Sequence, residues 1–256
     1  MLDLSPMKTL LTFFVLILIK LFGNIFYQVR VKKIGAQSFS WKDLRLIFLL
    51  NHTSLFEPIY ICALPISVIW KIAKNGVLPG ADITMSRPVM GWFFRLVTPN
   101  TVSISRRRDK TWKAFLERIK PESIILIAPE GRMKRSNGLD KMGKPMTVRG
   151  GVFDLLEKVD HGKMLLAYSG GLHHIMTPDE KLPRLFKKIR LAVELIDIQE
   201  YKRMLGFEKD PRWTRLQVAK DFELRRDRFC PEMEEELKSS SALSNNYNEG
   251  HYQTRV

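Results

Sequence analysis

The sequence predicts a single α/β domain in which helices flank a largely parallel central sheet, with a hydrophobic helix in front of the domain. Three observations support this fold class. Short, nearly continuous apolar runs alternate with helical stretches, as is typical of buried parallel strands. Hydrophobic residues make up 45% of the 256 residues, which is enough for a packed core. Without its two ends the chain keeps about 200 residues, a common size for one domain.

The N-terminal segment is the first element. Residues 10–19 (LLTFFVLILI) are almost entirely apolar, and the run resumes after Lys20, so that its length reaches the lower limit for a membrane-spanning helix. A cleaved signal peptide is disfavoured because Phe22-Gly23-Asn24 is a poor cleavage site. A helix buried in the domain stays an alternative. The basic residues that follow favour an interfacial or shallowly inserted membrane anchor, which we place at residues 1–34.

Runs of β-branched and aliphatic residues predict the strands, and the segments between them predict helices. The predicted strands are Leu44–Leu50, Ser67–Ile72, Thr101–Ser105, Ser123–Ala128, Lys163–Ser169 and Ile189–Ile198. The predicted helices are Ser54–Ala63, Pro88–Val97, Asp109–Ile119 and Gly151–Val159, and a charged helical stretch begins after Pro211. Residues 239–256 are rich in Ser and Asn without hydrophobic periodicity, so we expect a disordered tail there. The domain is therefore expected at residues 35–238.

The chain is strongly basic, with 42 Lys and Arg against 27 Asp and Glu and a net charge of +15. Nucleic acid, an anionic membrane surface and a phosphorylated small molecule are the polyanions that attract such a charge. The hydrophobic start and the lack of basic residues interleaved with aromatic ones argue against nucleic acid. The 2 cysteines are too few for a disulfide framework and indicate a reducing compartment.

Polar clusters follow four of the predicted strands. They are Asn51–Pro58, Arg106–Lys110, Pro129–Arg135 and Gly170–His174. Because the carboxyl ends of parallel strands share one edge of a sheet, we expect the clusters to form one site. No metal site is expected, since His173 and His174 are adjacent, point apart and have no acid or thiol ligand nearby in the sequence.

His52 and Glu57 are the first candidates for catalysis. On an ideal helix residues five apart are separated by about 140°, so two fully helical side chains would not meet. If His52 precedes the first turn, the long Glu57 side chain can fold back to its Nδ1. The carboxylate would then fix the tautomer and leave Nε2 free as a general base. Taken alone, such a pair is more typical of a structural histidine at a helix start.

The four clusters together resemble the 1-acylglycerol-3-phosphate acyltransferase (lysophospholipid and glycerolipid acyltransferase) family. That family has an N-H-x-x-x-x-D block, a block that ends in Arg, an F-P-E-G-T-R block and a later V-P-type strand. The corresponding blocks here are NHTSLFEP (Asn51–Pro58), VSISRRR (Val102–Arg108), APEGRMKR (Ala128–Arg135) and MLLAYSGG (Met164–Gly171). Their order and spacing agree with the family. Glu57 stands in place of the usual Asp, the third block lacks its Thr, and the fourth lacks V-P.

The resemblance implies an O-acyltransferase without a cofactor, which uses acyl-CoA or acyl carrier protein as co-substrate. His52 would be the general base and Glu57 would orient it. Arg106, Arg132 and Arg135 would bind the acceptor phosphate, because guanidinium groups suit phosphate oxygens. Glu130 would bind acceptor hydroxyls or hold one of these arginines, and Gly131 would belong to the same block. Arg107, Arg108 and Lys110 are expected to form a solvated or membrane-facing basic patch.

The expected partners are a lysophospholipid acceptor, an acyl thioester donor and an anionic membrane surface, with no nucleic acid. The expected localisation is at a membrane, with the catalytic domain facing the cytoplasm. Two alternatives stay open: acylation of a lipid other than lysophosphatidate, and a catalytically silent lipid-binding protein on the same scaffold.

Overall fold

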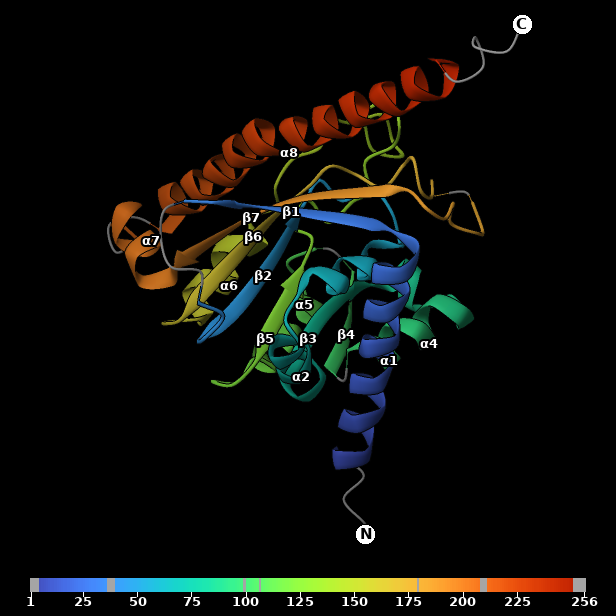
Figure 1. Ribbon diagram of the computed structural model, residues 1–256. Helices are drawn as coiled ribbons and strands as arrows, with labels where there is room; N and C mark the ends of the chain where they lie inside the picture. The colour runs from blue at the N-terminus through green and yellow to red at the C-terminus, as the bar shows by residue number, and fades with distance from the viewer. Residues whose placement is uncertain are drawn as a thin grey trace, which may run out of the picture.

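The computed structural model describes residues 5–35, 40–98, 100–105, 107–178, 180–207 and 211–250. Its centre is a seven-stranded sheet with the strand order β1-β7-β6-β2-β5-β3-β4 (Figure 1). The strands are β1 (Gln28–Ile34), β2 (Leu44–Leu50), β3 (Gly76–Ala81), β4 (Asn100–Ile104), β5 (Ile124–Ile127), β6 (Lys163–Ser169) and β7 (Lys188–Asp197). Strands β2 to β6 are parallel to one another, whereas β7 is antiparallel to β6 and β1 pairs in parallel with β7. The predicted fold class is confirmed.

Helices cover both faces of this sheet. They are α1 (Ser5–Phe26), the 3-10 helix η1 (Glu57–Ala63), α2 (Ile66–Asn75), α3 (Asp82–Met85), α4 (Pro88–Val97), α5 (Lys110–Glu117), α6 (Gly151–Lys158), α7 (Ile198–Met204) and α8 (Pro211–Gly250). Alternate side chains of β2 point to opposite faces. Leu46 and Phe48 pack with α5, α6 and α8, while Ile47 and Leu49 pack with α1, η1 and α2. The sheet therefore separates two hydrophobic cores.

Several elements differ from the prediction. The predicted strand Ser67–Ile72 is wrong, because these residues lie in α2. Val68, Ile69 and Ile72 are buried on one side of that helix, while Trp70 and Lys71 are exposed, so the period is helical. The predicted helix Ser54–Ala63 begins only at Glu57.

Strands β1 and β3 were not predicted. The segment QVRVKKI of β1 is mostly exposed and polar, as is common at the edge of a sheet. The segment GVLPGA of β3 contains Gly and Pro, which usually count against a strand.

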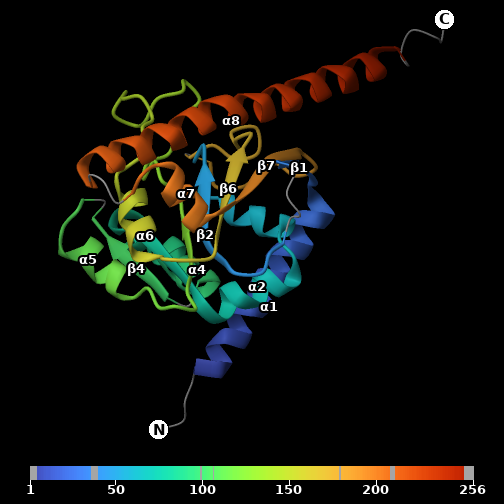
Figure 2. The ribbon, with the colours of Figure 1, turned by 90° about the vertical axis from the view of Figure 1, so that its left-hand side faces the viewer.

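The helix α8 crosses the molecule on the side away from the N-terminal end of α1 (Figure 2). It packs against β6, β7 and α6. Its residues 239–250 continue the helix where the sequence predicts a disordered tail, and no Gly or Pro between Pro231 and Gly250 ends it. Residues 251–256 of the predicted tail lie outside the described residues.

One face of α1 is docked on the domain. Leu16 is fully buried. A Cβ atom added at Gly23 would lie only 2.7 Å from the Cβ of Cys62, so no larger residue fits there without a shift of the neighbouring chain. The Nζ of Lys20 donates to the carbonyl oxygens of Cys62 at 2.7 Å and Leu64 at 2.9 Å. The opposite face of α1 is exposed and apolar. By length and composition alone α1 is suited to cross a membrane.

Candidate active site

The chain leaves β2 through a tight turn that directs His52 out of the sheet. Asn51 has a φ of 68°, a left-handed conformation that Asn adopts more readily than most residues. Its backbone N–H donates to Oε1 of Glu130 at 2.8 Å, and its Nδ2 donates to the carbonyl oxygen of Ser169 at 2.8 Å. The ends of β2, β5 and β6 are thus joined around the residue that precedes His52.

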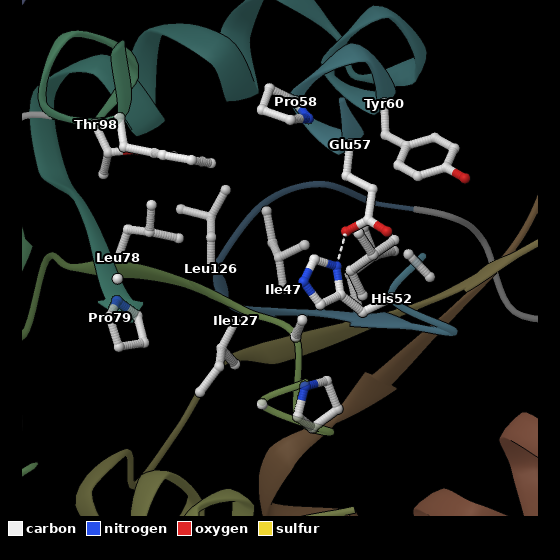
Figure 3. Close-up of a pocket in the computed structure, with 18 of the residues that line it drawn as sticks. Ile47, His52, Glu57, Pro58, Tyr60, Leu78, Pro79, Thr98, Leu126 and Ile127 are labelled. Carbon is white, nitrogen blue, oxygen red and sulfur yellow. Dashed lines mark hydrogen bonds and ion pairs between the residues drawn. The ribbon is translucent and has the colours of Figure 1, made fainter. Parts of the chain in front are cut away.

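His52 contacts Glu57 directly. The distance between Nδ1 of His52 and Oε2 of Glu57 is 2.5 Å (Figure 3). The second oxygen of Glu57 accepts the backbone N–H groups of Thr53 at 2.6 Å and Ser54 at 3.2 Å. These bonds hold the buried carboxylate in one orientation. The contact is possible because η1 begins only at Glu57, so His52 precedes the first turn.

The protonation of His52 reflects opposing effects. Burial lowers the pKa of the imidazole, but the charge of Glu57 and its hydrogen bond, together with the charge of Glu130, outweigh burial. The pKa of His52 is therefore raised above its ordinary value of 6.5. A proton accepted by His52 is stabilised by these carboxylates, which is the property that a general base needs.

His52 faces a large cavity of about 770 Å³. Figure 3 shows the ring of His52 between Glu57 and the apolar side chains of the cavity, with its second nitrogen directed away from Glu57. Most of the wall is apolar and comes from the sheet, η1, α3 and α4. The apolar lining includes Ile47, Leu49, Leu78, Phe94, Val97, Leu126, Ile127 and Leu165. The volume lies within the usual range of small-molecule sites.

Arginines also line this cavity. Arg107 and Arg108 follow β4, and Arg149 precedes α6. Arg108 donates from Nη2 to Oδ1 of the buried Asp154 at 2.9 Å. The same carboxylate accepts Nη1 of Arg215 at 2.7 Å and Nε1 of Trp112 at 2.8 Å. Asp154 therefore fixes the orientation of an arginine whose side chain is otherwise exposed.

These three arginines were not among the predicted site residues. Arg107 and Arg108 were expected in a solvated or membrane-facing basic patch, and Arg149 was given no separate role. Arg107 and Arg108 follow a strand and Arg149 precedes a helix. Because ligands bind at the carboxyl ends of parallel strands, these positions could have indicated cavity residues from the sequence.

Two of the three arginines predicted to bind phosphate, Arg132 and Arg135, do not line the cavity. The guanidinium of Arg132 pairs with Asp140 and donates to Thr147 Oγ1 at 3.0 Å and to the carbonyl oxygen of Pro145 at 3.2 Å. Both Nη groups are thus committed within its own loop, while Nε is buried and has no partner among the described residues. Arg106 lies outside the described residues.

Glu130 and Gly131 have separate positions. Gly131 lines the cavity with a φ of 62°, which glycine adopts at low cost. Glu130 does not line it; the residue is fully buried and uses Oε1 to hold Asn51. Its Oε2 has no hydrogen-bond partner among the described residues, and burial raises the pKa of this carboxyl group. Glu130 thus supports the turn before His52.

No group of three or more His, Cys, Asp or Glu side chains is placed to hold a metal ion within the described part of the chain. The site instead contains the imidazole of His52, the carboxylate of Glu57 and the arginines of the cavity, which suit proton transfer and anion binding.

A family model described as Acyltransferase matches residues 30–167, more than half of the chain. The chain belongs to the acyltransferase family. The matched segment includes the His52–Glu57 pair and most of the cavity wall.

The fold of this acyltransferase is also found in a solved structure. The crystal structure of the 1-acyl-sn-glycerophosphate (LPA) acyltransferase PlsC from Thermotoga maritima aligns with a TM-score of 0.52 and 17% sequence identity. The alignment covers 90% of this chain and 84% of that chain. At this identity the likeness establishes the fold. No match is found among curated proteins.

Proposed function

We propose that this acyltransferase moves a fatty acyl group from an acyl thioester to the free hydroxyl of a lysophospholipid of the lysophosphatidate type. The observation that carries the proposal is the His52 ring at the wall of an apolar cavity, with Nδ1 held by a buried carboxylate 2.5 Å away. A catalytically silent lipid-binding protein has no need of this oriented base.

In the proposed reaction, Nε2 of His52 accepts the proton of the acceptor hydroxyl. The oxygen attacks the thioester carbonyl, and the tetrahedral intermediate collapses with loss of the thiolate. The imidazolium then returns its proton to the leaving sulfur. Glu57 holds the productive tautomer and stabilises the imidazolium, so the enzyme forms no covalent intermediate.

Different parts of the cavity wall suit different parts of the substrates. Its apolar wall suits an acyl chain, and Arg107, Arg108 and Arg149 suit a phosphate group. The thioester is carried by coenzyme A or acyl carrier protein, and no further cofactor takes part. These donors, and the free cysteines Cys62 and Cys230, suit a domain on the cytoplasmic side of the membrane.

Mass spectrometry of lipids tests the proposal. The protein is incubated with mixed lysophospholipids and acyl-CoA, and the experiment is repeated with acyl carrier protein as the donor. Wild type should form a diacyl phospholipid, and His52→Ala should lose at least a hundredfold in rate because the base is removed. The exposed His161→Ala is the control and should keep full activity. Unchanged activity in His52→Ala would exclude this mechanism.

A further inference from the structure

The helix α4 carries an exposed apolar face that the catalytic site does not use. Val89 and Trp92 are 74% and 63% exposed, and Ile83 of the neighbouring α3 is 57% exposed. Phe93, Phe94 and Val97 pack inward on the other side of α4. Burial of large apolar side chains away from water is favourable, so a face of this kind indicates a partner.

The helix α4 lies beside α1. α1 packs against both α2 and α4, and these helices form one side of the molecule (Figure 1). Leu11, Phe14, Leu18, Leu21 and Ile25 of α1 are exposed at intervals of three or four residues, and they form one apolar stripe along the helix.

The contacts of α1 indicate that it does not cross a bilayer. The buried residues Thr12, Leu16 and Gly23 spread over about half of the helix, so the domain covers one side of α1 along that length. A helix that crossed the hydrocarbon core, which is about 30 Å thick, would lose this cover. Lys20 is also bound to the carbonyl oxygens of Cys62 and Leu64 at the end of η1. α1 is therefore suited to lie in the membrane interface.

We propose that α4, with Ile83 of α3, is a second membrane-inserting element that enters the same leaflet as the outer stripe of α1. The occupant of this surface is an anionic phospholipid leaflet. Exposed basic side chains accompany these helices: Arg87 directly before α4, Arg95 on α4, and Lys71 and Lys74 on α2, which also packs against α1. Such residues are attracted to anionic headgroups, and Trp92 suits the boundary between headgroups and acyl chains.

The position of the cavity favours a lipid over a second protein copy. α3 and α4 supply Thr84, Met85, Phe94 and Val97 to the cavity wall. The same two helices carry the exposed apolar residues, so they separate the cavity from the proposed membrane surface. An acyl chain that leaves the leaflet beside α4 can enter the cavity along apolar side chains. This delivery rests on the proposed function, whereas membrane insertion of α4 does not.

Co-sedimentation with vesicles of phosphatidylcholine and phosphatidylglycerol tests the surface. The variant carries Val89→Glu with Trp92→Glu. The matched control carries Trp213→Glu with Leu216→Glu, which have the same spacing on α8 and are 60% and 66% exposed. The α4 variant should lose at least tenfold in vesicle partitioning, because two inserted apolar side chains are replaced by charges. The α8 variant should bind as wild type does.

Equal vesicle binding by wild type and the α4 variant would overturn the proposal, and so would an equal loss in the α8 variant. A loss of dimers in the α4 variant, seen by light scattering without lipid, would assign the face to a second copy instead. Brominated acyl chains should quench tryptophan fluorescence more in wild type than in Trp92→Phe, and equal quenching would count against insertion. If wild type binds vesicles through α4 but transfers no acyl group, the proposed function fails and the membrane surface stands.

Discussion

At the scale of single residues, the pairing of His52 with Glu57 depends on one side-chain length and one backbone turn. The left-handed Asn51 directs the imidazole away from β2, and η1 begins with the carboxylate that meets it. Glu57 also accepts two backbone N–H groups of the intervening residues. The extra methylene of Glu, compared with the Asp typical of the family, is therefore accommodated by a turn that is closed around the carboxylate.

Glu57→Gln should change both the tautomer and the pKa of His52. The Gln amide donates to Nδ1 and so favours a proton on Nε2, which should lower kcat about a hundredfold or more. Loss of the negative charge should also move the pKa of His52 downward from its raised value. Since the base acts when neutral, the acidic limb of the pH profile should lie above pH 6.5 in wild type and shift to lower pH in the variant. NMR titration of the His52 ring measures this shift directly, and an unchanged pKa would contradict the assignment.

The arginines that line the cavity should differ from Arg132 in their effect on the substrate. Arg108→Gln and Arg149→Gln should each raise KM for a lysophosphatidate about tenfold or more, since each removes a charged donor to phosphate. Arg132→Gln should leave KM unchanged, because Arg132 does not line the cavity and its two Nη groups are used by Asp140, Pro145 and Thr147.

A neutral monoacylglycerol acceptor, assayed with the same three variants, shows whether the arginines bind the phosphate of the acceptor or the phosphates of coenzyme A. If Arg108 and Arg149 bind the acceptor, their KM effect should vanish with the neutral lipid. If they bind the phosphates of coenzyme A, the effect should appear in KM for the donor. An increase in KM for Arg132→Gln alone would restore the original assignment.

At the scale of elements, the contact between α1 and η1 decides how the hydrophobic N-terminus is used. Hydropathy alone does not distinguish a spanning helix from a docked one. Here Lys20 lies in the middle of the apolar run and satisfies two carbonyl oxygens at the end of η1. A lysine in the middle of a membrane-spanning helix would be unfavourable. In this fold the same lysine joins α1 to η1.

Lys20→Met should weaken this contact. The substitution keeps an apolar side chain of similar length but leaves the carbonyl oxygens of Cys62 and Leu64 without their charged donor, so the free energy of unfolding should fall by about 1–3 kcal/mol. Urea denaturation in mild detergent measures the change, with the exposed Lys8→Met as the control. Equal stability of the two variants would show that Lys20 does not secure α1.

At the scale of the whole molecule, α8 links β7 to the active site although it lies outside the segment matched by the family model. Glu234 accepts Nδ2 of Asn51 at 3.0 Å and Nζ of Lys134 at 3.0 Å. Earlier in α8, Arg225 binds both carboxylate oxygens of Glu194 in β7 at 2.8 and 2.9 Å. The long helix therefore connects β7 with the turn that carries His52.

Arg225→Met should destabilise the whole fold. Glu194 and Asp221 would lose their shared cation in a half-buried setting, and the expected loss of unfolding free energy is about 3 kcal/mol. Thermal unfolding measures the effect, with the exposed Arg228→Met as the control. A variant as stable as the control would show that α8 is held by its apolar contacts alone.

The local sequence pattern was sufficient to predict several secondary-structure elements and one side-chain contact. β2, β6 and α4 were predicted with their observed limits, because their apolar periods are uninterrupted and their ends carry clear signals. The His52–Glu57 contact was also predicted, since the two residues are only five positions apart. Segments with mixed signals were predicted wrongly or missed, as in α2, β1 and β3.

The sequence by itself determined the fold class, the acyltransferase blocks and the pair of His52 and Glu57. Only the tertiary structure decided which cations face the cavity and how α1 is used. Arg132 has a carboxylate partner in its own loop, Arg108 is held by a carboxylate on α6, and Lys20 bonds to residues more than 40 positions away. A charge pattern does not specify its partner, because that choice depends on which groups packing brings within hydrogen-bond distance.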